Sequence, residues 1–165
     1  FRKPLVVFTP KKLLRYPKAV SGFAAMAKGG FQKVIDDPRM ATASARKPVD
    51  TVVLCSGKIY YDLIERLEEQ AAPNIAFVRV EQLHPLPQAE LDAVVQQYGS
   101  DVNCIWVQEE PQNMGAWSFM LQHYTSVPLS VISRSLSASP ASGSSAIHAK
   151  RQSAIIDEVF SHANG

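Results

Sequence analysis

The sequence predicts an α/β fold, with a mostly parallel sheet covered by helices on both faces. From Asp50 onward, short β-branched apolar runs alternate with longer segments of helical periodicity. Such alternation is typical of parallel sheets, because a helix must carry the chain back before the next strand begins. The 165 residues, 46% of them hydrophobic, are enough for one main domain with a sizeable core.

Four strand–helix pairs make up the regular part of the chain. In order they are "TVVLC" (51–55) and "YYDLIERLEEQ" (60–70), "IAFVRV" (75–80) and "AELDAVVQQYG" (89–99), "CIWVQ" (104–108) and "AWSFMLQHY" (116–124), and "LSVIS" (129–133) and "AIIDEVF" (154–160). The strand candidates are short and rich in β-branched residues, whereas the helix candidates repeat apolar residues every three or four positions.

The first fifty residues are less regular. "PLVVF" (4–8) is predicted as a short strand, and Thr9-Pro10 then provides an N-cap and a first-turn proline for a short helix in "KKLLRY" (11–16). "GFAAMA" (22–27) is weakly helical, and "FQKVI" (31–35) is predicted as a strand. Residues 36–50 have the Pro, Ser and Asp content of a loop. We expect the region before Phe31 to lie outside the main fold.

Composition excludes several classes of protein. Seventeen basic and fifteen acidic residues give a net charge of +2 without a Lys/Arg tract, which argues against a nucleic-acid partner. No apolar run approaches the roughly 20 residues of a membrane span. Cys55 and Cys104 lie inside apolar runs and are expected to be buried thiols, as in a reducing compartment. There is no secretory signal, and the chain opens at Phe1 instead of Met, so we expect a piece of something longer.

Common nucleotide and hydrolase motifs are missing. "CSGKIYYD" has one glycine where a dinucleotide site needs Gly-x-Gly-x-x-Gly, and it lacks the leading glycine of a P-loop. None of the four histidines accompanies a Gly-x-Ser-x-Gly or His-Glu-x-x-His pattern. Surface or capping roles are therefore the expectation for the histidines.

Lys58 occupies an electrostatically unfavourable position. If Ser56 is the N-cap of the helix after "TVVLC", Lys58 lies in the first turn, where the helix dipole disfavours a cation by roughly 0.3–1 kcal/mol. A bound anion at the helix N-terminus would offset this energy. The alternative is that Lys58 reaches an acidic neighbour or solvent.

The stretch "VQEEPQNMGAW" (107–117) is predicted to be the corner between a strand and a helix. Glu109 and Glu110 point to opposite faces of a strand, so they cannot form a coupled catalytic pair. Asn113 can cap the following helix, and Gly115 permits a close backbone approach. We expect one of the two carboxylates to be held by backbone N–H groups or a basic residue. The corner is compatible with an interface or with a pocket.

Five separated blocks carry a family resemblance. They are "KPLVVFTPKKLLRYP", "CSGKIYYDL", "VRVEQLHPLP", "VQEEPQNMGAW" and "SASPASGSSAIH". In order and spacing the chain resembles the C-terminal region of the 2-oxoglutarate dehydrogenase family, the thiamine-diphosphate-dependent first components of a multienzyme complex. The match spans nearly the whole chain.

The resemblance implies a three-layer domain similar to the C-terminal domain of transketolase, with a five-stranded sheet in which residues 31–35 form the one antiparallel strand. It assigns residues 1–30 to the end of a preceding pyrimidine-binding domain and its linker, and residues 31–165 to the transketolase-like domain. Thiamine diphosphate and Mg²⁺ would bind outside this chain, in a homodimeric parent. That parent would decarboxylate 2-oxoglutarate and pass the succinyl group to a lipoyl-lysine of the succinyltransferase core.

Within this picture the chain supplies scaffold, dimer contacts and regulation, and it contains neither a catalytic residue nor a metal site. The expected interface residues are Gln108, Glu109, Glu110, Asn113, Gly115 and Trp117. The expected phosphate-recognising patch, for a nucleotide or acyl-coenzyme A effector, consists of Lys58 and Ser56 with one or more of Arg15, Arg79 and Arg134. The open alternatives are an effector-binding module, a free-standing α/β enzyme and a 2-oxoadipate dehydrogenase domain. The compartment would be the cytoplasm in a bacterium and the mitochondrial matrix in a eukaryote.

Overall fold

The computed structural model of the chain describes residues 2–162. It divides into two compact units, Phe1–Phe31 and Gln32–Gly165. Residue 1 and residues 163–165, which open and close the two expected domains, lie outside the described residues. Each unit is described by itself.

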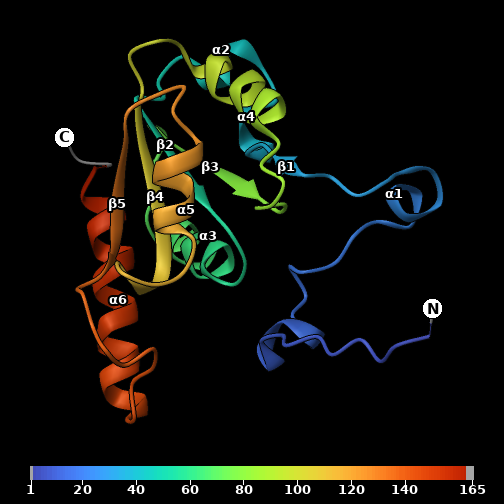
Figure 1. Ribbon diagram of the computed structural model, residues 1–165. Helices are drawn as coiled ribbons and strands as arrows, with labels where there is room; N and C mark the ends of the chain where they lie inside the picture. Colours follow the sequence, from blue (N-terminus) through green and yellow to red (C-terminus); the bar gives the residue numbers. More distant parts are fainter. Residues whose placement is uncertain (1, 163–165) are drawn as a thin grey trace. The chain divides into compact units, whose positions relative to one another are not determined.

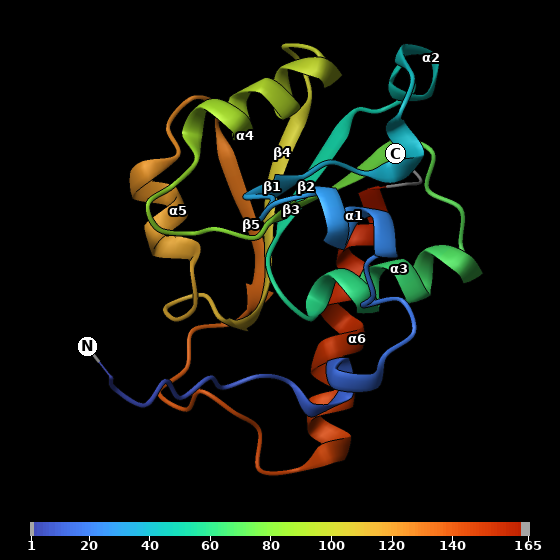
Figure 2. The same cartoon turned by 90° about the vertical axis from the view of Figure 1, so that its right-hand side faces the viewer.

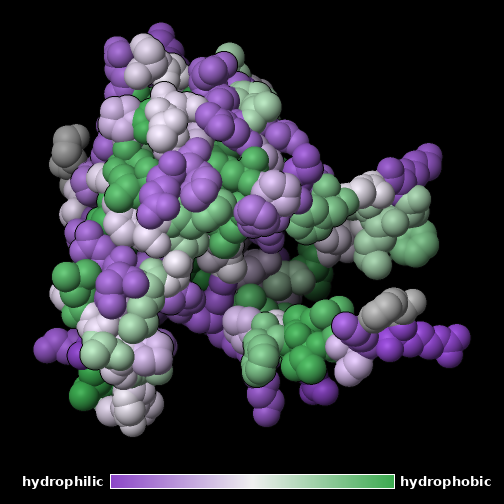
Figure 3. All heavy atoms as spheres, in the orientation of Figure 1, coloured by the Kyte–Doolittle hydropathy of each residue, from purple (hydrophilic) through white to green (hydrophobic). Residues whose placement is uncertain are grey.

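The first unit contains a 3₁₀ helix, η1 (Lys11–Arg15), and one α-helix, α1 (Phe23–Lys28). Both fall where the sequence predicts helical turns. The expected strand at residues 4–8 is wrong, since this segment pairs with no strand in the described chain. Its apolar side chains are open to solvent, with Leu5 at 87% and Phe8 at 96% exposure. Hydrophobic surface on this unit is visible as green spheres in Figure 3.

The second unit is built on a five-stranded sheet in the order β1-β3-β2-β4-β5. The strands are β1 (Val34–Ile35), β2 (Thr51–Cys55), β3 (Ile75–Val80), β4 (Asn103–Pro111) and β5 (Leu129–Arg134). The pair β1–β3 is antiparallel and the other pairs are parallel, which confirms the expected mixed sheet. Strand β1 is shorter than the predicted run from residue 31, whereas β4 extends to Pro111.

Helices cover both faces of the sheet. The larger ones are α3 (Ile59–Glu69), α4 (Gln88–Val95), α5 (Trp117–His123) and α6 (Ser145–Ser161), and the 3₁₀ helix η3 (Gln96–Tyr98) continues α4. Helices α3 and α6 lie on one face, and α4 and α5 lie on the other (Figures 1 and 2). None of the helices in residues 2–162 is both long and apolar enough to cross a membrane.

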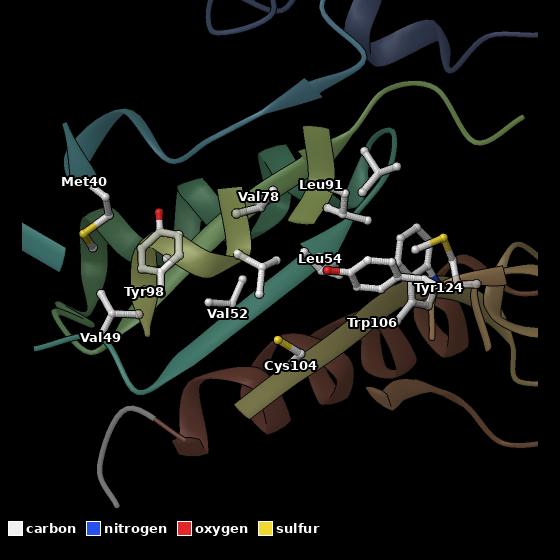
Figure 4. Packing of buried hydrophobic residues seen from close by; sticks show 14 residues of the cluster. Met40, Val49, Val52, Leu54, Val78, Leu91, Tyr98, Cys104, Trp106 and Tyr124 are labelled. Carbon is white, nitrogen blue, oxygen red and sulfur yellow. The ribbon is translucent and has the colours of Figure 1, made fainter. Parts of the chain in front are cut away.

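Two apolar cores result from the alternation of side chains along the strands. Val53, Ile105 and Val107 pack with α3 and α6, whereas Val52 and Trp106 pack with α4 and α5. Figure 4 shows the second of these cores, in which Trp106 and Tyr124 lie beside Leu54. Strands β2 and β4 are buried on both faces, as their uninterrupted apolar runs predict.

Both cysteines are free and buried, as expected. Burial raises the pKa of the Cys55 thiol to about 12 and that of Cys104 to about 11. The thiols therefore stay protonated at neutral pH and act as small apolar side chains.

The predicted loop at residues 36–50 contains two short helices, η2 (Pro38–Met40) and α2 (Ala43–Arg46). Their N-caps are side chains that the sequence offers at the right spacing: Asp37 accepts from the backbone of Arg39, and Thr42 from that of Ala45. Asp37 is also 2% exposed and accepts from the Phe77 backbone N–H. The expectation of an irregular loop is therefore wrong in part, because composition alone does not reveal capping.

Candidate functional site

The crevice between the carboxyl ends of β2 and β4 is the place where this topology would accept a ligand. Strand β2 lies between β3 and β4 in the sheet. The chain passes from β2 through α3 to β3 on one side of β2, and then through α4 to β4 on the other side of β2. Open α/β sheets bind ligands where the connections diverge in this way. The residues at this point are Ser56–Lys58 after β2 and Gln108–Glu110 at the end of β4.

A cluster of four polar side chains occupies this crevice. Lys58 Nζ lies 2.7 Å from Glu109 Oε1 and 2.5 Å from Asp62 Oδ2. Gln152, which α6 contributes from the far end of the chain, donates from Nε2 to the same two oxygens at 2.9 Å each. The cluster thus joins β4, α3 and α6 through one ammonium group and one carboxamide.

The electrostatics of the cluster stabilise the charged form of Lys58. Partial burial lowers the pKa of Lys58, but hydrogen bonds and charge attraction from Asp62 and Glu109 outweigh burial and raise the pKa overall. A lysine that acts as a base or nucleophile needs a lowered pKa. Lys58 is therefore suited to holding two carboxylates and is unsuited to proton transfer.

The expected helix start at Ser56 is wrong by two residues. Helix α3 begins at Ile59 with Lys58 itself in the N-cap position, and Gly57 adopts φ +75° in the turn before it. Asp62, one turn into the helix, faces back to Lys58. Of the two alternatives for Lys58, the acidic neighbour is the one found, so the electrostatic reason for an anion at this helix end disappears.

Gln108 holds the corner between β4 and α5 together. Its Oε1 accepts from Trp106 Nε1 and from the backbone N–H of Trp117, both at 2.9 Å. Its Nε2 donates to the backbone oxygens of Met114 at 2.7 Å and Pro111 at 3.1 Å. The side chain is 4% exposed. A buried carboxamide with this many partners fixes the turn, because each lost partner would leave a desolvated polar group.

Two expectations for this corner have opposite outcomes. Gly115 adopts φ +66°, and a Cβ there would lie 3.0 Å from the Gln108 amide, so the close approach is confirmed. The capping role expected for Asn113 is wrong. Asn113 instead exchanges two hydrogen bonds with the backbone of Ser137, both 3.0 Å long, and Gln108 caps α5.

Glu109 and Glu110 follow a register shift in β4, and both line a small pocket with Arg134 and His148. Glu109 shares the α3–α6 face with Val107 and is held by Lys58, which confirms that a basic residue secures one carboxylate. Glu110 is exposed. Trp117 packs against the α4–α5 core while remaining half-buried.

The arginines of the expected phosphate patch occupy different surroundings. Arg79 pairs with Glu81 and stacks over the Tyr60 ring at 4.7 Å. Arg134 lines a cavity between β5 and α6 and also a smaller pocket with Glu109 and Glu110. Arg15 belongs to the first unit. Sequence reasoning missed Asp62 and Gln152; the four-residue spacing from Lys58 could have indicated Asp62, whereas Gln152 carries no local signal.

A comparison with known families matches residues 20–160 to the family described as "2-oxoglutarate dehydrogenase C-terminal". The chain belongs to this family. It is 42% identical over 171 residues to the 2-oxoglutarate dehydrogenase E1 component of Cupriavidus necator, covering 100% of this chain. It is 39% identical over 167 residues to the corresponding component of Azotobacter vinelandii, covering 96%.

The chain spans only 18% of the length of the Cupriavidus protein and 17% of the length of the Azotobacter protein. A multifunctional 2-oxoglutarate metabolism enzyme of Mycobacterium is 38% identical, with 13% of its length covered. Among solved structures, a 2-oxoglutarate:ferredoxin oxidoreductase from Magnetococcus marinus aligns with TM-score 0.52 and 14% identity over 85% of this chain and 21% of that one. This last likeness supports the transketolase-like α/β fold.

Thiamine diphosphate is the cofactor that the family implies, and the crevice offers few groups that could hold its diphosphate or an accompanying metal ion. The one ammonium group in the crevice already holds Asp62 and Glu109, and the turn after β2 has a single glycine. Residues 2–162 contain no group of three or more His, Cys, Asp or Glu side chains placed to hold a metal ion. The residues of this crevice do not fit a magnesium diphosphate.

Proposed function

We propose that the chain is the C-terminal structural and dimerisation domain of a 2-oxoglutarate dehydrogenase E1 component. In that parent, decarboxylation of 2-oxoglutarate on thiamine diphosphate and succinyl transfer to the lipoyl-bearing core take place on residues outside this chain. The carrying observation is the occupied crevice: Lys58 and Gln152 hold the carboxylates of Asp62 and Glu109 where this fold would otherwise bind a ligand. The names of the relatives favour 2-oxoglutarate over 2-oxoadipate as the parent's substrate.

The first unit fits a role as the end of the preceding domain. Residues 4–8 are apolar, extended and exposed, with Val6 and Val7 at 73% and 70%. Such a segment buries its side chains and satisfies its backbone only when it joins a sheet. We therefore propose that residues 1–30 complete the upstream pyrimidine-binding domain of the parent and connect it to the unit that follows.

The dimer interface is proposed to include the corner from Gln108 to Trp117. Trp117 is half-buried and offers a large apolar side chain on a corner that Gln108 holds rigid. For the effector alternative, the pairing of Lys58 with two carboxylates removes the argument for an anion at that residue.

Two measurements test the proposed function. Calorimetry of the 165-residue chain with Mg²⁺ and thiamine diphosphate is expected to show no saturable binding, and micromolar binding would contradict the division of roles. In the complete parent enzyme, Trp117→Ala is expected to raise the dimer dissociation constant, with activity falling only as dimers are lost. Leu121→Ala, an exposed apolar position on the same helix, serves as the matched control. A fully dimeric Trp117→Ala enzyme would remove Trp117 from the interface.

A further inference from the structure

A cavity of about 370 Å³ lies between the end of β5 and one side of α6. Arg134 at the end of β5 and Arg151 on α6 both line it, together with the serine-rich segment that connects the two elements. The buried side chain of Ile155 forms part of its wall, and Glu158 is the one carboxylate among its lining residues. Its size falls within the range of about 300–1,000 Å³ that is typical of small-molecule sites.

The two guanidinium groups are not neutralised within residues 2–162. Arg134 donates from Nη2 to His148 Nδ1 at 3.0 Å, and Arg151 donates from Nη1 to the Ser142 hydroxyl at 3.1 Å. Neither forms an ion pair with a carboxylate of the described chain. Every other arginine of the second unit, namely Arg39, Arg46, Arg66 and Arg79, has an acidic partner there. Arg134 and Arg151 are thus a local exception to the charge pairing of this domain.

Arg134 also has an unsatisfied buried donor. Its Nε–H, like that of Arg46, has no acceptor in the described chain. A desolvated donor without a partner is unfavourable by roughly 1–3 kcal/mol, and more for a charged group. The guanidinium group of an arginine presents its N–H groups in a fork that matches the oxygens of a phosphate.

We propose that this cavity binds the phosphate group of a small molecule, with Arg134 and Arg151 as its two charged donors. Phosphate is favoured over a carboxylate because two guanidinium groups carry two positive charges and offer more donors than the two oxygens of one carboxylate can use. The buried Ile155 provides apolar surface next to the charged end of the ligand. None of the residues that line the cavity belongs to the Lys58 cluster, whereas Pro111 lies in the corner that is proposed as the dimer interface.

The experiment is a calorimetric titration of the full 165-residue chain with inorganic pyrophosphate in a low-salt chloride buffer. We expect saturable binding at one site per chain. Arg134→Gln and Arg151→Gln should each weaken binding about ten-fold or more, because each removes a charge-assisted contact. Arg134→Lys, which keeps the charge and loses the fork, should also weaken it. Circular dichroism of each variant checks that the fold is retained.

Lys150→Gln is the matched control. Lys150 precedes Arg151 on α6 and is exposed, and its substitution removes the same charge. It should change the affinity by no more than about two-fold. An equal effect of Lys150→Gln and Arg151→Gln would mean unspecific attraction to a basic helix and would overturn the site. Absence of saturable pyrophosphate binding, or equally tight binding of succinate, would overturn the phosphate assignment. Each of these results leaves the proposed dimerisation role untouched.

Discussion

Lys58 and Glu109 meet at 2.7 Å across the carboxyl ends of two neighbouring parallel strands, although they stand fifty-one positions apart in the sequence. Their side chains are 20% and 22% exposed. The contact is therefore more desolvated than a surface ion pair, whose median contribution is only about 0–1 kcal/mol. It closes the crevice where many folds of this kind bind their ligands.

Replacing Glu109 by Gln should lower the free energy of unfolding by about 1.5–3 kcal/mol, the range for hydrogen bonds to charged groups. Asp62 remains bound to Lys58 in this variant, which limits the loss. Glu110→Gln is the control; its exposed side chain should change stability by no more than about 0.5 kcal/mol. Urea unfolding of the 165-residue chain measures both. Equal effects at the two positions would show that the Lys58–Glu109 contact contributes nothing.

The contribution of Lys58 should disappear in alkaline solution. Because the folded state raises the pKa of Lys58 above its ordinary value of 10.5, the stabilisation is complete below that value and is lost as the pH rises through the folded-state pKa. The difference in urea midpoint between the parent chain and Lys58→Met should be constant from about pH 7 to 9 and should shrink above about pH 10.5. A difference that instead grows with pH would mean that the folded state lowers this pKa.

Gly115→Ala should be more destabilising than Gly57→Ala. Both glycines have positive φ, +66° and +75°, so both substitutions introduce backbone strain of about 1 kcal/mol. At Gly57 a Cβ would meet no atom within 4 Å, whereas at Gly115 it would press on the buried Gln108 amide at 3.0 Å. Thermal unfolding of the two variants separates strain from collision. If the two melting temperatures fall equally, the Gln108 side chain moves away from the added Cβ without a loss of stability.

Asp37→Asn should be among the most destabilising single changes in the chain. The Asp37 carboxylate is 2% exposed, pairs with Arg39 and accepts from the Phe77 backbone N–H. Removing one partner of a buried charged pair lowers stability by about 3–5 kcal/mol. Asp101→Asn, at an exposed turn, is the control and should be near neutral. Denaturant unfolding measures the loss of stability. A loss below about 1 kcal/mol for Asp37→Asn would show that Asp37 contributes no more than an exposed ion pair does.

Neither thiol should react in the folded chain at pH 8. Burial raises the pKa of Cys55 to about 12 and that of Cys104 to about 11, and it shields both sulfurs from reagents. Mass spectrometry after iodoacetamide treatment should find no modification in buffer and two modifications in denaturing urea. Rapid labelling of either cysteine in buffer would show that the sheet opens locally at that strand.

The sequence by itself determined the layered α/β fold and much of its detail. The mainly apolar runs at residues 51–55 and 104–108 predicted strands of a sheet covered by helices on both faces, and β2 and β4 form there. These features depend on the period of the backbone, which is a local property. The family resemblance added the antiparallel strand, of which only Val34 and Ile35 pair with β3.

The tertiary structure alone decided which polar groups meet. Ser56 and Asn113 have the chemistry of N-caps, yet neither caps the helix that follows it. Helix α3 begins at Ile59, and the backbone N–H of Trp117 in α5 donates to the buried carboxamide of Gln108 from the preceding strand. The apolar run at residues 4–8 forms no strand here, since strand formation requires a partner that lies next to it in space. Gln152 reaches Glu109 only because α6 packs across the sheet from the end of the chain. Local sequence determines the period and the propensity of each segment, whereas contacts between distant segments are set by how the packed layers bring them together.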